Sequence, residues 1–299
     1  MILDFGYVCM EFQVNLKDSF IIPCISESES HTFHPGGSAT NQAIAAARSG
    51  AKISLGGTVG NDLFGKTIME ALRREGIQTP AIATSELPTG IIHSVIDSDN
   101  QKGTIFSAGA NVESSADQIP KGTLNERVLL LLQNDFPALT NLRILRHAKR
   151  HNARSIMTIA NRDNISADLL DELDILIIDE NTLSTFCRQF SVSDEDGPQI
   201  LAEKHKLYFV VTHKDGYAGA SATNKTGEVT KQGAVSKKKV INKGSVFDSF
   251  CGTFAACVQA SMSLPKSLEY ATCAATITAT KSTEHNAFPY LGDIEELVS

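Results

Sequence analysis

Short apolar segments alternate with segments of helical period from residue 34 onward, and this alternation constrains the fold more than any other feature of the chain. Several of the apolar segments are apolar throughout, as strands covered on both faces are. We expect strands at residues 2–8, 52–58, 127–133, 155–159, 175–178 and 207–212. Helical composition falls at residues 39–49, 64–75, 138–151, 182–189 and 199–206. The pattern predicts an α/β fold with a mostly parallel central sheet.

Two segments, 12–33 and 90–108, break this rhythm because they alternate polar and apolar residues without an intervening helix. The second contains a turn-forming stretch at 99–103 that predicts a β-hairpin. The two segments are alike in texture, so we expect them to pair as a small β-sheet within one domain spanning residues 1–299. Open α/β sheets bind ligands at the carboxyl ends of their strands, and the small sheet is expected to cover that edge as a lid.

The composition excludes one class of partner. The 299 residues include 27 Lys and Arg against 34 Asp and Glu, which gives a net charge of −7. Such a chain has no net positive field for a polyanion, so we expect no nucleic-acid partner. The lysine run at 237–239 is typical of a solvated strand end. Any bound phosphate must therefore be held by a local set of donors.

The cysteines and the apolar segments favour a reducing compartment. Six cysteines are spread along the chain with no C-x-x-C pair and no zinc-ligand spacing, which predicts free, mostly buried thiols. No apolar segment approaches the ~18 residues that a membrane span needs, and the first residues lack the pattern of a signal peptide. We expect a cytoplasmic protein with no membrane partner.

A glycine pair at 36–37 precedes a helix dense in small residues. Gly36 and Gly37 allow a ligand to lie against backbone N–H groups at the helix start. Asn41, in the first turn, carries an amide that can bind a sugar hydroxyl. The same residues are also compatible with a tight turn capped by Ser38, so the motif alone leaves both interpretations open.

A polar loop at 243–247 leads into a second helix dense in small residues, with Asp248 at its start. A carboxylate there can act as a general base beside helix N–H groups that bind phosphate. It can equally be a helix cap. The position alone does not decide between the two roles.

Together these segments resemble the ribokinase or PfkB family of carbohydrate and nucleoside kinases over nearly the whole chain. The matching motifs lie at residues 36–43, 50–51, 59–65, 89–90, 109–111, 248–252 and 288–289. The resemblance implies a three-layer α/β/α domain with a β-sheet lid, which transfers the γ-phosphoryl group of ATP to a sugar hydroxymethyl group. It also implies Mg²⁺, allows K⁺, and by analogy predicts a homodimer formed through the lid.

The resemblance assigns roles to individual residues. Asp248 aligns with the catalytic base of the family. The sugar-side positions are Glu11, Gly36, Gly37, Ser38, Asn41 and Asp135. The nucleotide-side positions are Asp179, Thr212, Lys214, Gly216, Ser245, Val246 and Phe247, and the metal-side positions are Asp179 and Glu180.

The chain departs from the family pattern mainly on the phosphate side. Ser245, Val246 and Phe247 stand where the family has Gly-Ala-Gly, and side chains there crowd the backbone amides. Thr182 stands where the family has a metal-organising Glu. On the sugar side, Glu11 replaces a shorter Asp, which alters which polyol fits.

Three functions are compatible with these residues. The first is an ATP-dependent kinase for ribose or a similar sugar. The second is a degenerate family member that binds a sugar or nucleoside without phosphoryl transfer, and the third is a nucleoside kinase.

Overall fold

The computed structural model describes residues 1–18, 26–98, 102–160, 166–189, 191–214, 218–235, 240, 244–281 and 287–299. Its main sheet has nine strands in the order β13-β12-β11-β10-β9-β8-β1-β4-β5. The strands are β1 (Ile2–Phe5), β4 (Ile53–Gly60), β5 (Gln78–Ser85), β8 (Leu129–Gln133), β9 (Arg154–Ile159), β10 (Ile175–Asp179), β11 (Phe209–His213), β12 (Gly219–Thr223) and β13 (Val229–Gly233).

All neighbours from β5 to β11 pair in parallel, and β12 and β13 add an antiparallel edge. The chain runs outward from β1 through β4 to β5 and then returns to the other side of β1 as β8. This change of direction places a topological switch point at β1 and β8. Ligands of open parallel sheets bind outside the carboxyl ends of the strands at such a point.

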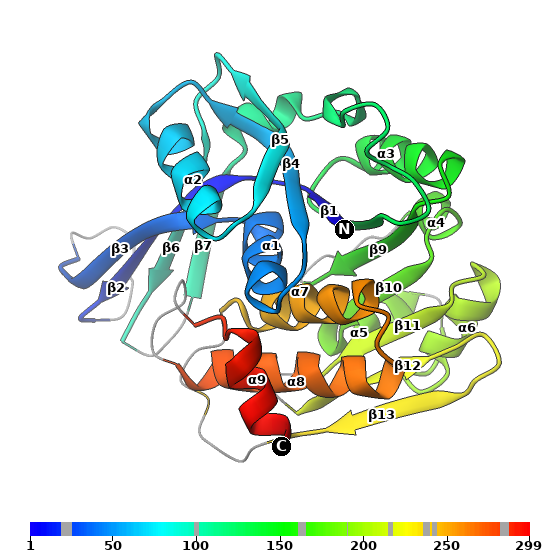
Figure 1. Cartoon of the computed structure of the whole chain (residues 1–299). Helices are drawn as coiled ribbons and strands as arrows, with labels where there is room; N and C mark the ends of the chain where they lie inside the picture. The colour runs from blue at the N-terminus through cyan, green and yellow to red at the C-terminus, as the bar shows by residue number, and fades with distance from the viewer. Residues whose placement is uncertain are drawn as a thin grey trace.

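Helices cover both faces of the sheet, so the molecule has three layers (Figure 1). One core lies beneath α1 (Ser38–Arg48), α2 (Leu63–Arg74), α7 (Val246–Gln259) and α8 (Leu264–Thr280). A second core lies beneath α3 (Ala138–Arg150), α4 (Ala167–Leu170), α5 (Glu180–Gln189) and α6 (Gly197–Lys204). Side chains alternate along each strand, so Ile2 enters the first core and Leu3 the second. The short helix α9 (Leu291–Val298) packs against α8.

The lid is a separate sheet of four strands in the order β3-β2-β6-β7, standing beside the main sheet (Figure 1). These strands are β2 (Cys9–Leu16), β3 (Ser28–Gly36), β6 (Gly90–Ile96) and β7 (Lys102–Ser107). The two outer pairs are antiparallel, and β2 pairs with β6 in parallel. The expected pairing of two distant segments is confirmed. Two 3₁₀ turns, η1 (Gly109–Glu113) and η2 (Ala116–Gln118), follow the lid.

The first strand is shorter than the expected 2–8, and that prediction is wrong. β1 ends at Phe5, and β2 of the lid begins at Cys9. Val8 is fully buried between the two sheets, where the Asn111 side chain accepts from its N–H at 2.9 Å and donates to its carbonyl at 3.0 Å. A side-chain amide thus replaces a neighbouring strand, which explains why the segment is apolar without being a strand.

Five of the six cysteines fall in the described residues, and all five are free and buried, as expected. Cys24 lies outside the described residues. Within the described ranges, no helix has both the length and the hydropathy needed to cross a bilayer.

Candidate active site

The turn between β3 and α1 brings three parts of the backbone close together. Gly37, the N-cap of α1, has a φ of 90°, and a Cβ added there would lie only 2.7 Å from the carbonyl oxygen of Tyr7. A Cβ on Gly36 would lie 2.8 Å from the Cβ of Glu11. Only glycine tolerates this combination of positive φ and close approach. The glycine pair therefore fixes the start of α1 against the loop after β1 and against the lid.

A hollow of about 140 Å³ lies at this point, between the start of α1, the end of β8 and the lid. The ring of Phe106 from β7 stacks on Tyr7 with a centroid separation of 5.2 Å and an interplanar angle of 16°. The structure brings three predicted sugar-side residues together here. The residues that line the hollow are Tyr7, Cys9, Gly37, Ser38, Ile92, Thr104, Phe106 and Asp135.

Glu11 and Asn41, two further predicted sugar-side residues, do not line this hollow. Glu11 is buried on β2, and its Oε1 accepts a hydrogen bond from Ser94 Oγ at 2.6 Å. Asn41 is buried in α1 and donates to Asp248. Glu11 therefore contacts Ser94, and Asn41 contacts Asp248, and neither lines the hollow.

Asp248 lies in the first turn of α7, directly after a left-handed turn. Ser245, the N-cap, has a φ of 57° and a ψ of 2°. A serine thus adopts a conformation that glycine adopts more cheaply, at a cost of about 1–3 kcal/mol. At the start of the helix, the Ser249 N–H donates a hydrogen bond to the Ser245 carbonyl oxygen at 2.9 Å. The N–H groups of the preceding residues have no acceptor within the helix.

Two consecutive amides of α1 hold the Asp248 carboxylate. Asn41 Nδ2 donates to Oδ2 at 3.0 Å, and Gln42 Nε2 donates to Oδ1 at 2.9 Å. Burial raises the pKa of Asp248 to about 7, and the negative charges of Asp135 and Glu11 add to this, while the two amide donors oppose it. A carboxyl with such a pKa is divided between its two protonation states near neutral pH, as suits a general base.

Behind Asp248, a chain of buried polar groups continues into the sheet. Gln133 Nε2 donates to Gln42 Oε1 at 3.1 Å and to Asp4 Oδ1 at 2.8 Å. The Thr158 hydroxyl also contacts Gln42. Of these residues, only Asp248 was predicted from the sequence. A charged residue inside an apolar strand, as Asp4 is, could have indicated a buried polar network.

The predicted nucleotide-side residues lie near the carboxyl ends of β10 and β11 and at the start of α7. Thr212 is buried, and its Oγ1 has no hydrogen-bond partner among the described residues. Lys214 is exposed after β11, and Gly216 lies outside the described residues. The ring of Phe247 packs edge-on against His213, with centroids 5.7 Å apart. Val246 is buried in the core beside it.

A family model described as "pfkB family carbohydrate kinase" matches residues 1–289 of the chain. The chain belongs to this family. A ribokinase of Lactococcus lactis is 24% identical over 265 residues, covering 87% of this chain and 84% of the relative.

Solved structures show the same fold for this pfkB-family chain. Ribokinase from Thermotoga maritima superposes with a TM-score of 0.90 at 23% identity, covering 99% of this chain and 98% of the other. Arabidopsis thaliana ribokinase, solved with ribose and ATP, superposes with a TM-score of 0.84 at 21% identity, covering 100% of this chain and 98% of the other. The three-layer domain with its lid is thus the fold of ribokinases.

The predicted metal-side residues Asp179 and Glu180 lie at the start of α5 in this pfkB-family chain. Asp179 Oδ1 accepts from the N–H groups of Asn181 and Thr182 at 3.1 and 3.0 Å, and the Thr182 hydroxyl donates to Oδ2. Asp179 is therefore the cap of α5, while Glu180 is exposed. The described residues contain no group of three or more His, Cys, Asp or Glu side chains arranged to hold a metal. Asp179 and Glu180 stay predicted metal-side positions, since Mg²⁺ needs only one or two carboxylates when phosphate oxygens also bind it.

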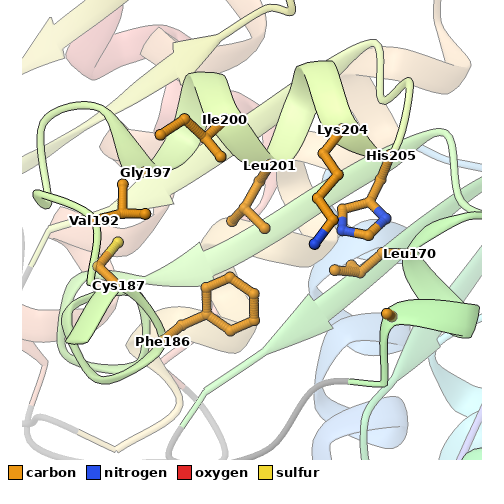
Figure 2. A pocket seen from close by; sticks show the side chains of 10 residues that line it. Leu170, Phe186, Cys187, Val192, Gly197, Ile200, Leu201, Lys204 and His205 are labelled. Atoms are coloured by element: carbon orange, nitrogen blue, oxygen red, sulfur yellow. The ribbon is translucent and has the colours of Figure 1, made fainter. Parts of the chain in front are cut away.

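A second hollow, of about 260 Å³, lies between α4, α5 and α6 (Figure 2). Leu170, Phe186 and Leu201 make its wall largely apolar, with His205 and Lys204 at one end. None of the predicted site residues lines it. The candidate active site is therefore the hollow at the carboxyl ends of β1 and β8.

Proposed function

We propose that this protein is an ATP-dependent sugar kinase that phosphorylates a hydroxymethyl group of ribose or a similar sugar. The observation that carries the proposal is Asp248, held by Asn41 and Gln42 at the start of α7 with a pKa raised to about 7. The family membership supports phosphoryl transfer to an alcohol, and the Arabidopsis ribokinase solved with ribose and ATP supports this substrate pair.

In this proposal Asp248 accepts the proton of the sugar hydroxyl as that oxygen attacks the γ-phosphorus of ATP, and the bond from this phosphorus to the β–γ bridging oxygen breaks, so that ADP leaves. The first-turn N–H groups of α7 then face the oxygens of the transferred phosphoryl group, where charge accumulates. Mg²⁺ enters with ATP as part of the substrate, since this cation is commonly bound through phosphate oxygens and one or two carboxylates. The carboxylate of Asp135 binds sugar hydroxyls from the other side of the hollow.

The size of the hollow favours a simple sugar over a nucleoside. Pockets for drug-sized molecules range from about 300 to 1,000 Å³, whereas this hollow has about 140 Å³. The stacked rings of Tyr7 and Phe106 form part of its wall. A compact polyol fits this space better.

One observation favours a second function, sugar binding without phosphoryl transfer. Both carboxylate oxygens of Asp179 are engaged by the first turn of α5, and Phe247 packs where the nucleotide loop is expected. In that case the protein would bind its sugar through the hollow and leave ATP unused.

The test is sugar-dependent ADP release from Mg·ATP by the full chain, with Asp248→Asn as the variant and Ser38→Ala as the control. We expect the wild type to release ADP with ribose or another pentose, and Asp248→Asn to lose about 10²–10⁴-fold in kcat. Ser38→Ala should change mainly the KM for the sugar. Equal turnover in Asp248→Asn contradicts the proposed base.

Thermal stabilisation separates the two functions. An active kinase is stabilised by its sugar and by Mg·ATP, because both ligands bind the native state. Stabilisation by the sugar alone, together with no ADP release, supports the binding function and contradicts the kinase.

The lid also supports a homodimer. Phe33 and Ile105 are 61% and 66% exposed, and the strand register places both on the same face as Phe12. Exposed apolar side chains that share one sheet face are typical of an interaction surface. Light scattering during size-exclusion chromatography should give twice the mass of the chain, and Phe33→Ser with Ile105→Ser should give the monomer.

A further inference from the structure

Asp4 is a carboxyl group placed inside an otherwise apolar sheet. It lies on β1, is 0% exposed, and has Leu3 and Phe5 as equally buried neighbours. Alternation along β1 turns Leu3 and Phe5 to one face of the sheet and Asp4 to the other, which α1 and α7 cover. A buried carboxyl is costly unless something compensates for the lost hydration, so its presence needs an explanation.

The polar partners of Asp4 lead back to Asp248. Gln133 Nε2 donates both to Asp4 Oδ1 at 2.8 Å and to Gln42 Oε1 at 3.1 Å. Gln42 Nε2 in turn donates to Asp248 Oδ1 at 2.9 Å. The four residues come from β1, β8, α1 and α7, and they form one continuous hydrogen-bonded chain.

This hydrogen-bonded series has a direction, because a side-chain amide has a donor end and an acceptor end. Because Asp4 Oδ1 accepts a hydrogen bond, the side-chain amide of Gln133 directs its nitrogen, and not its oxygen, at Asp4. The same nitrogen then faces Gln42 Oε1, which leaves the Gln42 nitrogen to face Asp248. If Gln133 were reversed, Gln42 would reverse as well and would present an oxygen to the Asp248 carboxylate.

Thr158 does not set this direction. Its hydroxyl lies 3.0 Å from Gln42 Nε2 and 3.2 Å from Gln42 Oε1. A hydroxyl both donates and accepts, so it satisfies either orientation of the amide. Within the described network, Asp4 is the group at the far end that distinguishes the two orientations.

Burial and neighbouring charges both act on the Asp4 carboxyl group. Burial raises the pKa of Asp4 well above its ordinary value, the hydrogen bond from Gln133 opposes this rise, and the charges of Asp248 and Asp135 add to it. Cys251 lies nearby as well, and burial raises the pKa of its thiol well above the ordinary value.

We propose that Asp4 is a positioning residue for the reaction, which orients the amides of Gln133 and Gln42 so that an N–H group is directed at Asp248. This inference rests on the proposed role of Asp248 as the base. It gives Asp4 no contact with the sugar or with ATP. An N–H donor favours the carboxylate form of Asp248, and an oxygen in its place disfavours that form.

The experiment measures the pKa of Asp248 directly, by ¹³C NMR of protein labelled at the aspartate carboxyl carbons, with Asp248→Asn used for assignment. The variants are Asp4→Val, which removes the acceptor, and Asp4→Asn, which keeps an acceptor oxygen and serves as the matched control. We expect the pKa of Asp248 to rise by about 0.5–1 unit in Asp4→Val and to stay near the wild-type value in Asp4→Asn.

Activity gives the second readout. The acidic limb of kcat/KM against pH should move upward by the same amount in Asp4→Val, with the KM for the sugar nearly unchanged. If Asp4→Val does not fold, Gln133→Leu interrupts the chain one residue later and should give the same upward shift. A lower Tm with an unmoved Asp248 pKa, or equal shifts in the Val and Asn variants, overturns the proposal.

The NMR measurement also separates this inference from the proposed function. A protein without any sugar-dependent ADP release contradicts the kinase, yet the titration of Asp248 still reports whether Asp4 orients the amides. A kinase with normal turnover and an unmoved Asp248 pKa in Asp4→Val contradicts the role of Asp4 alone.

Discussion

Asn41 and Asp248 are 207 residues apart in the chain, and Asn41 Nδ2 donates to Asp248 Oδ2 at 3.0 Å. Gln42, the next residue, donates to the other oxygen of the same carboxylate. Two consecutive side chains of α1 therefore position the first turn of α7. Since Gly37 fixes where α1 begins, the glycine turn also determines where the candidate base lies.

Replacing Asn41 with alanine should change the pH dependence of the reaction. Asn41→Ala removes one of the two amide donors to Asp248, so the pKa of about 7 should rise, by about 0.5–1 unit. The acidic limb of kcat/KM should move upward accordingly, measured as ADP release with the sugar varied. Ser38→Ala, at the start of the same helix, should leave the limb where it is. A limb that stays fixed in Asn41→Ala would show that this hydrogen bond does not tune the base.

The stability of the protein should fall as pH rises from about 4 to about 7. The pKa of Asp248 is raised from 3.8 to about 7, so the folded state holds a proton that the unfolded chain releases between those values. The free energy of unfolding therefore decreases with pH across this window and levels off above about 7. In Asp248→Asn the decrease should be smaller by on the order of 1–2 kcal/mol, because asparagine does not titrate and solvent around the half-buried Asp248 reduces the size of the effect.

Urea denaturation at the two ends of this range measures the effect. Asp4 titrates in the same direction, so Asp4→Asn provides the second comparison. Identical pH slopes in the wild type and in Asp248→Asn would mean that the folded protein does not raise the pKa of this carboxyl.

The strands at the centre of the sheet could be predicted because both of their faces are buried. β8 and β10 are apolar almost throughout, and their predicted bounds differ from the observed ones by no more than two residues. β13 has the sequence VTKQG and lies at the sheet edge, where exposed and half-buried residues alternate. Nothing in those five residues distinguishes an edge strand from a loop, so it was missed.

The candidate site could be predicted only where the backbone conformation requires a particular residue type. Gly37 is required by a positive φ and by a carbonyl 2.7 Å from any added Cβ, so glycine appears there. The contact of Asn41 with Asp248 could not be predicted in this way, because an amide in a first helical turn suits a ligand equally well. Ser245 shows the opposite case: a positive φ persists without glycine, so the replaced glycines did not imply a lost turn.

Removing the ring of Phe247 should improve the use of ATP. The ring is half-buried beside the first-turn amides of α7, and it packs against His213 at the end of β11. An apolar ring next to a phosphate site displaces water that would otherwise solvate the anion. We expect Phe247→Ala to lower the KM for Mg·ATP several-fold and to leave the KM for the sugar unchanged.

The same change should cost about 1–3 kcal/mol of stability, less than the loss of a fully buried ring. Phe12→Ala, in the lid, is the matched control for lost aromatic packing and should not affect the KM for Mg·ATP. An increase in that KM in Phe247→Ala would instead mean that the ring contacts the nucleotide favourably.

The far end of α1 is held by an ion pair whose loss should destabilise the protein without changing its chemistry. Arg48 Nη2 and Nε contact the two carboxylate oxygens of Glu75 at 2.6 and 3.0 Å, and Nη1 donates to the Phe288 carbonyl at 3.0 Å. Arg48→Met leaves the Glu75 charge partly buried and unpaired, which should cost about 3 kcal/mol in urea denaturation. Glu75→Gln keeps the bond from Arg48 to Phe288 and should cost less. Because Arg48 lies nearly two turns beyond Asn41 on α1, kcat per folded molecule should stay the same, and a drop in kcat in Arg48→Met would show that the start of α1 is held in place from its far end.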